Sequence, residues 1–167
     1  MGSRFEHVRH KPPTPLDQPR SMIIACPPLK SNVNLSRMVR LAGCCAIDRF
    51  IVCGQAKVDP KIARDGAETV RIESRNSLPP ILKKLSHEGY RIVGLEQTNL
   101  SQDLHTYQFT RKTVLVLGSE RNGITQDVLD CLDDTIEIPV WGLPYSYNIA
   151  TATTMAVYEY CRQFPRG

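Results

Sequence analysis

Short apolar runs alternate along the chain with stretches of helical periodicity. Runs such as Lys112–Gly118 (KTVLVLG) are typical of strands, and this one is apolar enough to be buried on both faces of a sheet. We predict strands over 21–25, 49–53, 69–72, 90–95, 112–118 and 135–138, and helices over 34–45, 60–65, 78–88, 125–132 and 148–164. Strands that alternate with helices predict an α/β fold with a mostly parallel sheet flanked by helices.

The first twenty residues differ from the rest, because they are polar and contain four prolines. They predict a basic, proline-rich N-terminal arm over 1–20 without a core of its own, followed by one domain over 21–167. Whether the arm contacts phosphates or is a disordered terminus stays open at this point. It is too polar for a signal peptide, and no apolar run approaches the roughly 20 residues of a membrane helix, so we expect a cytoplasmic protein without a membrane segment.

The net charge of +4 is unevenly distributed, since residues 1–119 carry +8 and residues 120–167 carry −4. A basic first part suits a polyanionic partner on one side of the molecule. The six cysteines form no C-x-x-C pair and have no histidine at zinc spacing. We therefore predict buried, reduced thiols and no metal site.

Ser31–Arg40 (SNVNLSRMVR) leads into the first predicted helix. We expect Asn34 to cap it, and we expect Arg37 and Arg40 to be neighbours on one side of it, where a pair of guanidinium groups suits a phosphate. For an arbitrary helix taken alone, a cap and two solvated arginines are the better explanation of the same residues.

Leu117–Ile124 (LGSERNGI) takes the most apolar strand into a loop with a glycine at each end, which lets a ligand approach the backbone. The segment has neither the Lys-Ser/Thr of a P-loop nor the G-x-G-x-x-G of a dinucleotide site. Ile138–Asn148 (IPVWGLPYSYN) then leads into the last helix. Ser146 and Asn148 lie at its N-terminus, where unpaired N–H groups favour an anionic group.

In this order and spacing, N-x-N-L-S-x-x-x-R, LGSERNGI and IPVWGLPYSYNIATA resemble the three motifs of the SpoU-type (TrmH-like) RNA 2′-O-ribose methyltransferases of the SPOUT superfamily. The resemblance covers residues 21–164. It implies an α/β fold with a C-terminal trefoil knot, and a homodimer with the first and last helices at its interface. It also implies S-adenosylmethionine as cofactor and no metal.

The resemblance also implies roles for individual residues. By motif position, the catalytic residues are Asn34, Arg40, Glu120, Ser146 and Asn148. The cofactor-binding residues are Leu95, Glu96, Leu117, Gly118, Ile138, Leu143, Ser146, Tyr147 and Asn148. Tyr147 departs from the Leu or Met that is usual in the family, which preserves a backbone contact but changes the shape of the pocket.

The implied reaction is methylation of an RNA ribose 2′-hydroxyl. The expected phosphate contacts are Arg4, Arg9, Lys11, Lys30, Arg37 and Arg40. With only a twenty-residue arm before the domain, the chain favours tRNA over rRNA as its substrate.

A non-catalytic RNA- or ribosome-binding module of the same fold remains an alternative, as does methylation of a base nitrogen or of a protein. A doubly wound nucleotide enzyme is disfavoured, because Cys26–Lys30 (CPPLK) offers no glycine-rich turn after the first strand.

Overall fold

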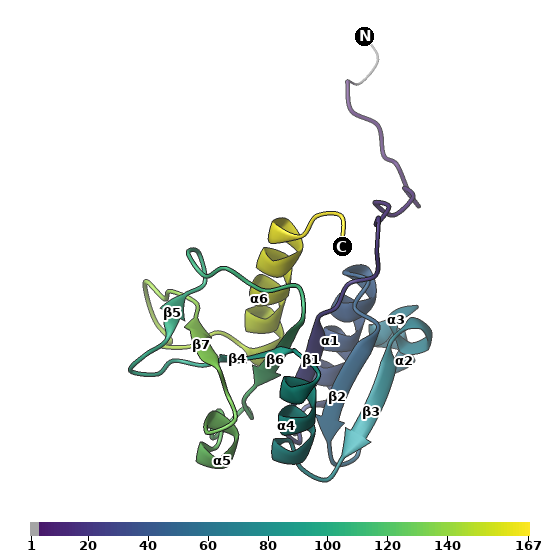
Figure 1. Cartoon of the computed structure of the whole chain (residues 1–167). Coiled ribbons are helices and arrows are strands. Elements are labelled where there is room, and N and C mark those ends of the chain that lie inside the picture. The colour runs from purple at the N-terminus through teal and green to yellow at the C-terminus, as the bar shows by residue number, and fades with distance from the viewer. Residues whose placement is uncertain (1–3) are drawn as a thin grey trace.

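Seven strands form one sheet across residues 4–167, the part of the chain that this computed structural model describes (Figure 1). They are β1 (Ile23–Cys26), β2 (Arg49–Cys53), β3 (Arg71–Arg75), β4 (Arg91–Leu95), β5 (Gln102–Asp103), β6 (Thr113–Leu117) and β7 (Asp134–Glu137). Their order across the sheet is β3-β2-β1-β6-β4-β7-β5, and every neighbouring pair is parallel. The predicted fold class is therefore confirmed. The trefoil knot stays a prediction from the resemblance.

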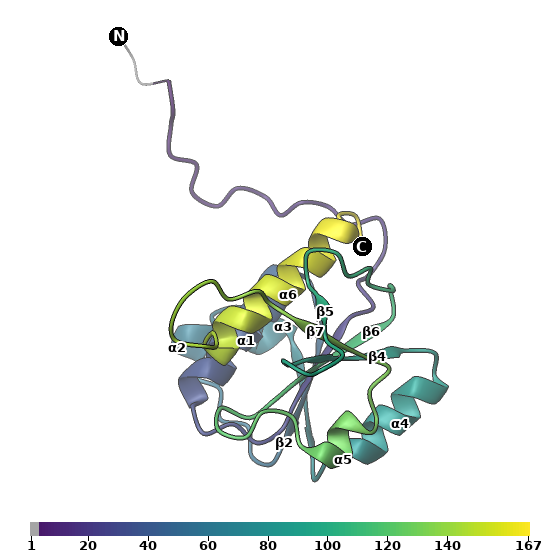
Figure 2. The same ribbon diagram turned by 90° about the vertical axis from the view of Figure 1, so that its left-hand side faces the viewer.

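Helices cover both faces of the sheet. They are α1 (Asn32–Cys44), α2 (Pro60–Ala63), α3 (Gly66–Thr69), α4 (Pro79–His87), α5 (Gln126–Leu129) and α6 (Ile149–Gln163). Figure 2 shows α1 and α6 on one side of the sheet, and α4 and α5 on the other. A strand buried on both sides needs apolar residues at successive positions, which explains the unbroken apolar runs of β1 and β6.

The core consists of two clusters, one on each face of the sheet. Ile24 of β1 lies in the cluster that contains Met38 of α1 and Tyr160 of α6. Its neighbour Ile23 points to the opposite face, into the cluster that contains Leu82 of α4. Each fully buried side chain of this size contributes about 1.5–3 kcal/mol to stability.

The predicted elements match the structure best where the pattern is strongly apolar. The strand expected at 69–72 lies instead at Arg71–Arg75, and Thr69 ends the one-turn helix α3, which was not predicted. The position of α3 depends on its packing against α1. A side chain on Gly66 would meet the backbone of Val39 in α1, so only a glycine lets α3 pack there. The two-residue strand β5 was also not predicted.

Asn34 does not cap α1, contrary to the sequence prediction. The helix begins earlier, and the Ser31 hydroxyl accepts a hydrogen bond from the Asn34 backbone N–H at 3.1 Å. Ser31 has the extended backbone of an N-cap residue, whereas Asn34 lies within the first turn. The Asn34 side chain is therefore available for other contacts.

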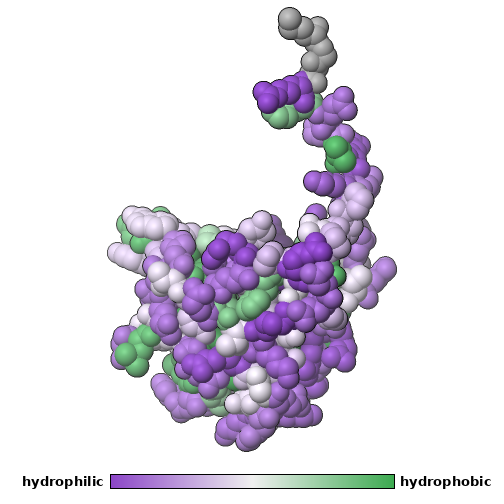
Figure 3. Space-filling view, turned by 45° about the horizontal axis from the view of Figure 1, so that its top comes forward, coloured by the Kyte–Doolittle hydropathy of each residue, from purple (hydrophilic) through white to green (hydrophobic). Residues whose placement is uncertain are grey.

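The arm leaves the body of the molecule in an extended conformation (Figure 3). Between Arg4 and Leu16 the described chain contains no helix or strand. The arm is held at its base by Asp17, which pairs with Arg166 at 2.8 Å, and by Arg20, which donates to the Phe164 carbonyl at 2.6 Å. Over residues 4–167, no helix is both long and apolar enough to cross a membrane.

Candidate functional site

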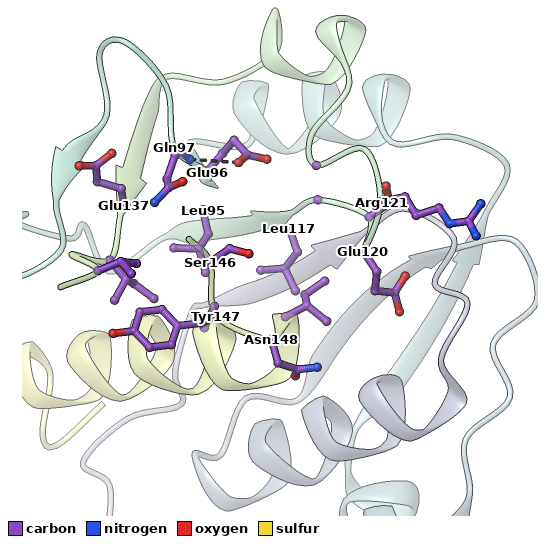
Figure 4. Close-up of a pocket in the computed structure, with 17 residues that line it drawn as sticks. Leu95, Glu96, Gln97, Leu117, Glu120, Arg121, Glu137, Ser146, Tyr147 and Asn148 are labelled. Atoms are coloured by element: carbon purple, nitrogen blue, oxygen red, sulfur yellow. Dashed lines mark hydrogen bonds between the residues drawn. The ribbon is translucent and has the colours of Figure 1, made fainter. Parts of the chain in front are cut away.

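A cavity of about 470 Å³ opens at the carboxyl ends of β4, β6 and β7, beside the start of α6 (Figure 4). Ligands bind at this edge in open parallel sheets, and the volume lies within the usual range for small-molecule sites. Of the predicted residues, the following line it: Leu95, Glu96, Leu117, Gly118, Glu120, Ile138, Ser146, Tyr147 and Asn148. Three segments far apart in the sequence thus meet in one site.

The loop after β6 is closed by a short pair of backbone hydrogen bonds. Ser119 N–H donates to the Gly123 carbonyl at 2.9 Å, and Gly123 N–H donates back to Ser119 at 3.2 Å. A side chain on Gly118 would lie 2.5 Å from the Gly123 backbone, and Gly123 has a φ of +63°. The two glycines of the second motif are therefore required by the loop itself, whether or not a ligand is bound.

Glu96 fastens this loop to the neighbouring strand. Its carboxylate accepts hydrogen bonds from the backbone N–H of Ile124 at 2.9 Å and from that of Gln97 at 3.0 Å. Figure 4 shows Glu96 and Gln97 together at the wall of the cavity. Glu96 thus positions the loop after β6 in addition to lining the cavity.

Glu120 projects from that loop toward the start of α1. Its carboxylate accepts from the backbone N–H groups of Lys30 and Ser31, each at 3.2 Å, and from the Asn34 side chain at 3.4 Å. Burial raises the pKa of Glu120, but these hydrogen bonds outweigh it and leave the pKa below its usual value. Glu120 is therefore ionised at neutral pH and serves as an acceptor, not as a proton donor.

Asn34 joins this loop to the last helix. Its side-chain oxygen accepts from the Asn148 amide at 3.3 Å, while the Asn148 oxygen caps α6 by accepting from Ala150 N–H at 2.9 Å. Asn34 is buried but is not part of the cavity wall, so it lies one contact behind Glu120 and Asn148. The first and third motifs are thereby linked to the second through hydrogen-bonded side chains.

Tyr147 uses its hydroxyl to hold the segment before α6, donating to the Pro139 carbonyl at 3.3 Å. A Leu or Met at this position could not make that bond. Leu143, which was predicted to bind the cofactor, does not line the cavity and is 76% exposed. Trp141 and Tyr145 beside it are also exposed, and the contact of Leu143 with the cofactor stays a prediction.

The six cationic residues that were predicted to contact RNA do not line the cavity. Arg37 and Arg40 are exposed on α1, and within residues 4–167 neither side chain has an ion pair or hydrogen bond. Arg4, Arg9 and Lys11 are exposed on the arm, and Lys30 is exposed just before α1. Their predicted contacts with RNA remain predictions.

Several residues of the cavity wall were not predicted. They are Gln97, Ser119, Arg121, Gly123, Glu137, Val140, Ile149 and Ala152. Most of these residues directly follow a strand or lie inside one of the three motifs. Their position at the carboxyl end of a strand is the sequence feature that could have identified them as cavity residues. Charge alone could not show that Arg121 and Glu137 lie at the same cavity.

The cysteines differ from their prediction. All six are free, but only Cys26 and Cys53 are buried, whereas Cys44 is exposed and Cys45, Cys131 and Cys161 are half-buried. Cys44 and Cys45 lie where α1 ends at the surface, which helical periodicity alone did not indicate. Among residues 4–167, no three His, Cys, Asp or Glu side chains are grouped so that they could hold a metal ion.

Comparison with known proteins assigns this chain to a family. The sequence model of the "SpoU rRNA Methylase family" matches residues 21–158 of this chain. This range contains all three motifs and every residue that lines the cavity. The chain belongs to the SpoU rRNA Methylase family. The resemblance seen in the sequence is therefore confirmed, and two of the three strand ends that form the cavity, those of β6 and β7, lead into the second and third motifs.

Two curated tRNA methyltransferases are similar to this chain over different lengths. The Aquifex aeolicus "tRNA (guanosine(18)-2′-O)-methyltransferase" is 27% identical over 148 residues, covering 86% of this chain and 70% of the relative. The mouse "tRNA (guanosine(18)-2′-O)-methyltransferase TARBP1" is 40% identical over 82 residues, covering 49% of this chain but only 5% of the relative. The match to the mouse protein therefore spans only a small part of that protein's length.

A solved SpoU structure has the same fold. The crystal structure of the "A. aeolicus TrmH/SpoU tRNA modifying enzyme" superposes with a TM-score of 0.83 at 25% identity, covering 87% of this chain and 76% of that one. The arrangement of sheet, loops and last helix is thus shared across most of the chain.

Proposed function

We propose that this protein transfers a methyl group from S-adenosylmethionine to a ribose 2′-hydroxyl of RNA, with tRNA as the favoured substrate. The observation that carries the proposal is the hydrogen-bonded series Glu120–Asn34–Asn148 at the edge of a ligand-sized cavity. It joins one residue from each of the three SpoU motifs. The names of the Aquifex and mouse relatives, both tRNA 2′-O-methyltransferases, support this reaction and this class of RNA.

The cavity fits S-adenosylmethionine chemically. Leu95, Leu117 and Ile138 supply apolar walls suited to an adenine ring, while Ser146 and the backbone at the strand ends supply polar groups for ribose and amino-acid atoms. The absence of a side chain on Gly118 keeps the backbone accessible there. When bound, the sulfonium supplies an activated methyl group with a neutral thioether as its leaving group, so the displacement needs no metal.

The protein's own task is then to align the ribose oxygen and to help remove its proton. Arg40 is a poor general base, because a guanidinium stays protonated in proteins. We assign Arg40 to binding the phosphate next to the target ribose and to stabilising the developing alkoxide. The proton acceptor stays open between that phosphate, water and solvent.

RNA would bind mainly through phosphates. The exposed cations Lys30, Arg37 and Arg40 lie on and beside α1, and the Lys30 backbone contacts Glu120 of the cavity wall. The arm carries Arg4, Arg9 and Lys11. The proposal includes a homodimer, a trefoil knot, a cytoplasmic location and the division into an arm (1–20) and one domain (21–167). These come from the sequence and the family resemblance.

Isothermal titration with S-adenosylmethionine, followed by incubation of the protein with labelled cofactor and total RNA, tests the function. Ribose methylation is mapped as linkages resistant to alkali. We expect binding heat and label in the tRNA fraction. Absence of binding heat, with the protein folded by circular dichroism, would favour a non-catalytic RNA-binding module. Binding without transfer to any RNA would contradict the proposed reaction.

A further inference from the structure

Arg121 lies in the middle of the loop after β6, at one end of the cavity (Figure 4). The backbone on both sides of it is fixed, because Ser119 and Gly123 exchange two backbone hydrogen bonds and the Ser119 hydroxyl accepts from the Asn122 N–H at 3.1 Å. The Arg121 side chain is exposed and makes no hydrogen bond or ion pair within residues 4–167. The loop therefore presents a guanidinium at the mouth of the cavity.

Lys30 brings a second cation to the same end of the cavity. Its backbone N–H donates at 3.2 Å to the carboxylate of Glu120, the residue before Arg121. The Lys30 side chain is exposed, and it too has no hydrogen bond or ion pair among the described residues. Glu120 accepts from neutral donors, which are two backbone N–H groups and the Asn34 amide. Two cations and one carboxylate leave this end of the mouth positively charged.

The opposite end of the cavity is acidic. Figure 4 shows Glu137 there, on the far side of the cavity from Arg121. Glu137 accepts from the Ser101 hydroxyl at 2.5 Å, and its partner in the strand register is Asp103, which is exposed. Over the described part of the chain, neither carboxylate forms an ion pair with a lysine or an arginine. This end of the cavity therefore repels phosphate groups.

We infer that Arg121 and Lys30 together bind one phosphate of the RNA backbone at the Glu120 end of the cavity, and that this phosphate clamp fixes the path of the RNA across the mouth. The inference deepens the proposed function and rests on it, because RNA is the partner. Cations from two separate segments contact one phosphate from two sides, and a guanidinium offers two parallel N–H donors to its oxygens. Neither residue lies on α1 or α6, the helices that the resemblance implies at a dimer interface.

The phosphate clamp differs from Arg40 in position and in task. Glu120 contacts α1 at Asn34, in its first turn, whereas Arg40 lies about 9 Å further along the helix axis at 1.5 Å per residue. The clamp and Arg40 therefore suit different phosphates of the same RNA. Because the clamp positions the RNA and Arg40 acts beside the target ribose, we expect Arg121→Gln to raise the KM for RNA and to leave kcat at saturating RNA nearly unchanged.

The salt dependence of RNA binding tests the phosphate clamp. The probe is purified, fluorescently labelled bulk tRNA, and its Kd is measured by anisotropy from about 50 to 200 mM KCl. We expect Arg121→Gln to weaken binding about tenfold at low salt, and Arg121→Lys, which keeps the charge, to keep the slope of log affinity against log salt. Because the two cations share one phosphate, the double variant Lys30→Gln/Arg121→Gln should reduce that slope by about one in total. A reduction of about two would mean two separate phosphates and would overturn the clamp.

Lys83→Gln is the matched control. Lys83 is also exposed, without a hydrogen bond or ion pair inside residues 4–167, but it lies on α4, on the opposite face of the sheet from α1 (Figure 2). We expect its Kd for bulk tRNA to stay within about twofold of the unaltered protein. Circular dichroism checks folding, and calorimetry with S-adenosylmethionine should give equal affinity in all variants. Weaker cofactor binding by Arg121→Gln with unchanged RNA binding would assign Arg121 to the cofactor and overturn the inference.

These measurements separate the phosphate clamp from the proposed reaction. If the unaltered protein binds bulk tRNA and Arg121→Gln has the same slope and affinity, the clamp is wrong and the proposed methyl transfer is unaffected. If the slope falls as expected but no RNA accepts the methyl label, the clamp stands and the proposed reaction is wrong. Absence of RNA binding by the folded, unaltered protein overturns both.

Discussion

Asn148 and Asn34 lie 114 residues apart in the sequence, yet the Asn148 amide donates to the Asn34 side-chain oxygen at 3.3 Å. The same Asn148 side chain caps α6 through its oxygen. One residue therefore uses its acceptor for helix stability and its donor to connect the third motif to the first. These two roles can be separated by substitution.

Asn148→Ala removes both contacts, whereas Asn148→Asp keeps the capping acceptor and removes only the donor. We expect the alanine variant to lose about 1 kcal/mol of unfolding free energy, and the aspartate variant to lose less than about 0.5 kcal/mol. Urea denaturation measures both. We expect both variants to lose most methyl transfer at equal RNA and cofactor concentrations. Full activity in a folded Asn148→Asp would show that the bond to Asn34 is not used in the reaction.

Glu120→Gln tests the ionised state of the carboxylate that joins the loop to α1. Because folding lowers the pKa of Glu120 below its ordinary 4.5, the stabilisation is complete above that value and is lost as pH falls through the folded-state pKa. The side chain is exposed, so we expect a difference of only about 0.5 kcal/mol at pH 7.

Comparing the wild type with Glu120→Gln from pH 7 to pH 3 cancels the contributions of the other carboxylates. The difference in unfolding free energy should be constant above the ordinary pKa of 4.5 and should decrease as the pH falls through the lower folded-state pKa. A difference that stays constant to pH 3 would mean that the hydrogen bonds from Lys30, Ser31 and Asn34 do not depend on the charge.

Gly123→Ala tests the loop that closes the cavity. A side chain at this position would meet the Glu96 carboxylate and would also need a φ of +63°. We expect cofactor affinity, measured by calorimetry, to fall at least about tenfold, the equivalent of roughly 1.4 kcal/mol. Gly142→Ala is the matched control, since nothing lies within 4 Å of the added methyl group. Equal affinity in the two variants would contradict a role for this loop in binding.

Arg40→Lys tests the phosphate contact that we assign to the guanidinium. A lysine keeps the charge but loses the planar, two-pronged geometry, so we expect turnover to fall about 10- to 100-fold with little change in cofactor affinity. Arg71→Lys on the exposed edge strand β3 serves as the control and should keep its turnover within about twofold. Near-full turnover in Arg40→Lys would overturn the assignment.

The sequence by itself determined the fold class, because the apolar runs of β1, β4 and β6 are long enough to require burial on both faces. The three motifs could also be identified from the sequence, because residue types and their spacing along the chain do not depend on the tertiary structure. Weakly apolar elements were not predictable in this way. β3 (RIESR) is a polar edge strand, and its position depends on pairing with β2, where Glu73 bridges Arg49 at 2.6 Å.

Only the tertiary structure decided which motif residues touch one another. Local rules assigned the cap of α1 to Asn34, but α1 starts earlier, at the Ser31 cap, and this leaves the Asn34 side chain for Glu120 and Asn148. The outward position of Leu143 likewise depends on how distant segments pack. Periodicity describes one element at a time, whereas these contacts arise between elements that are separated by most of the chain.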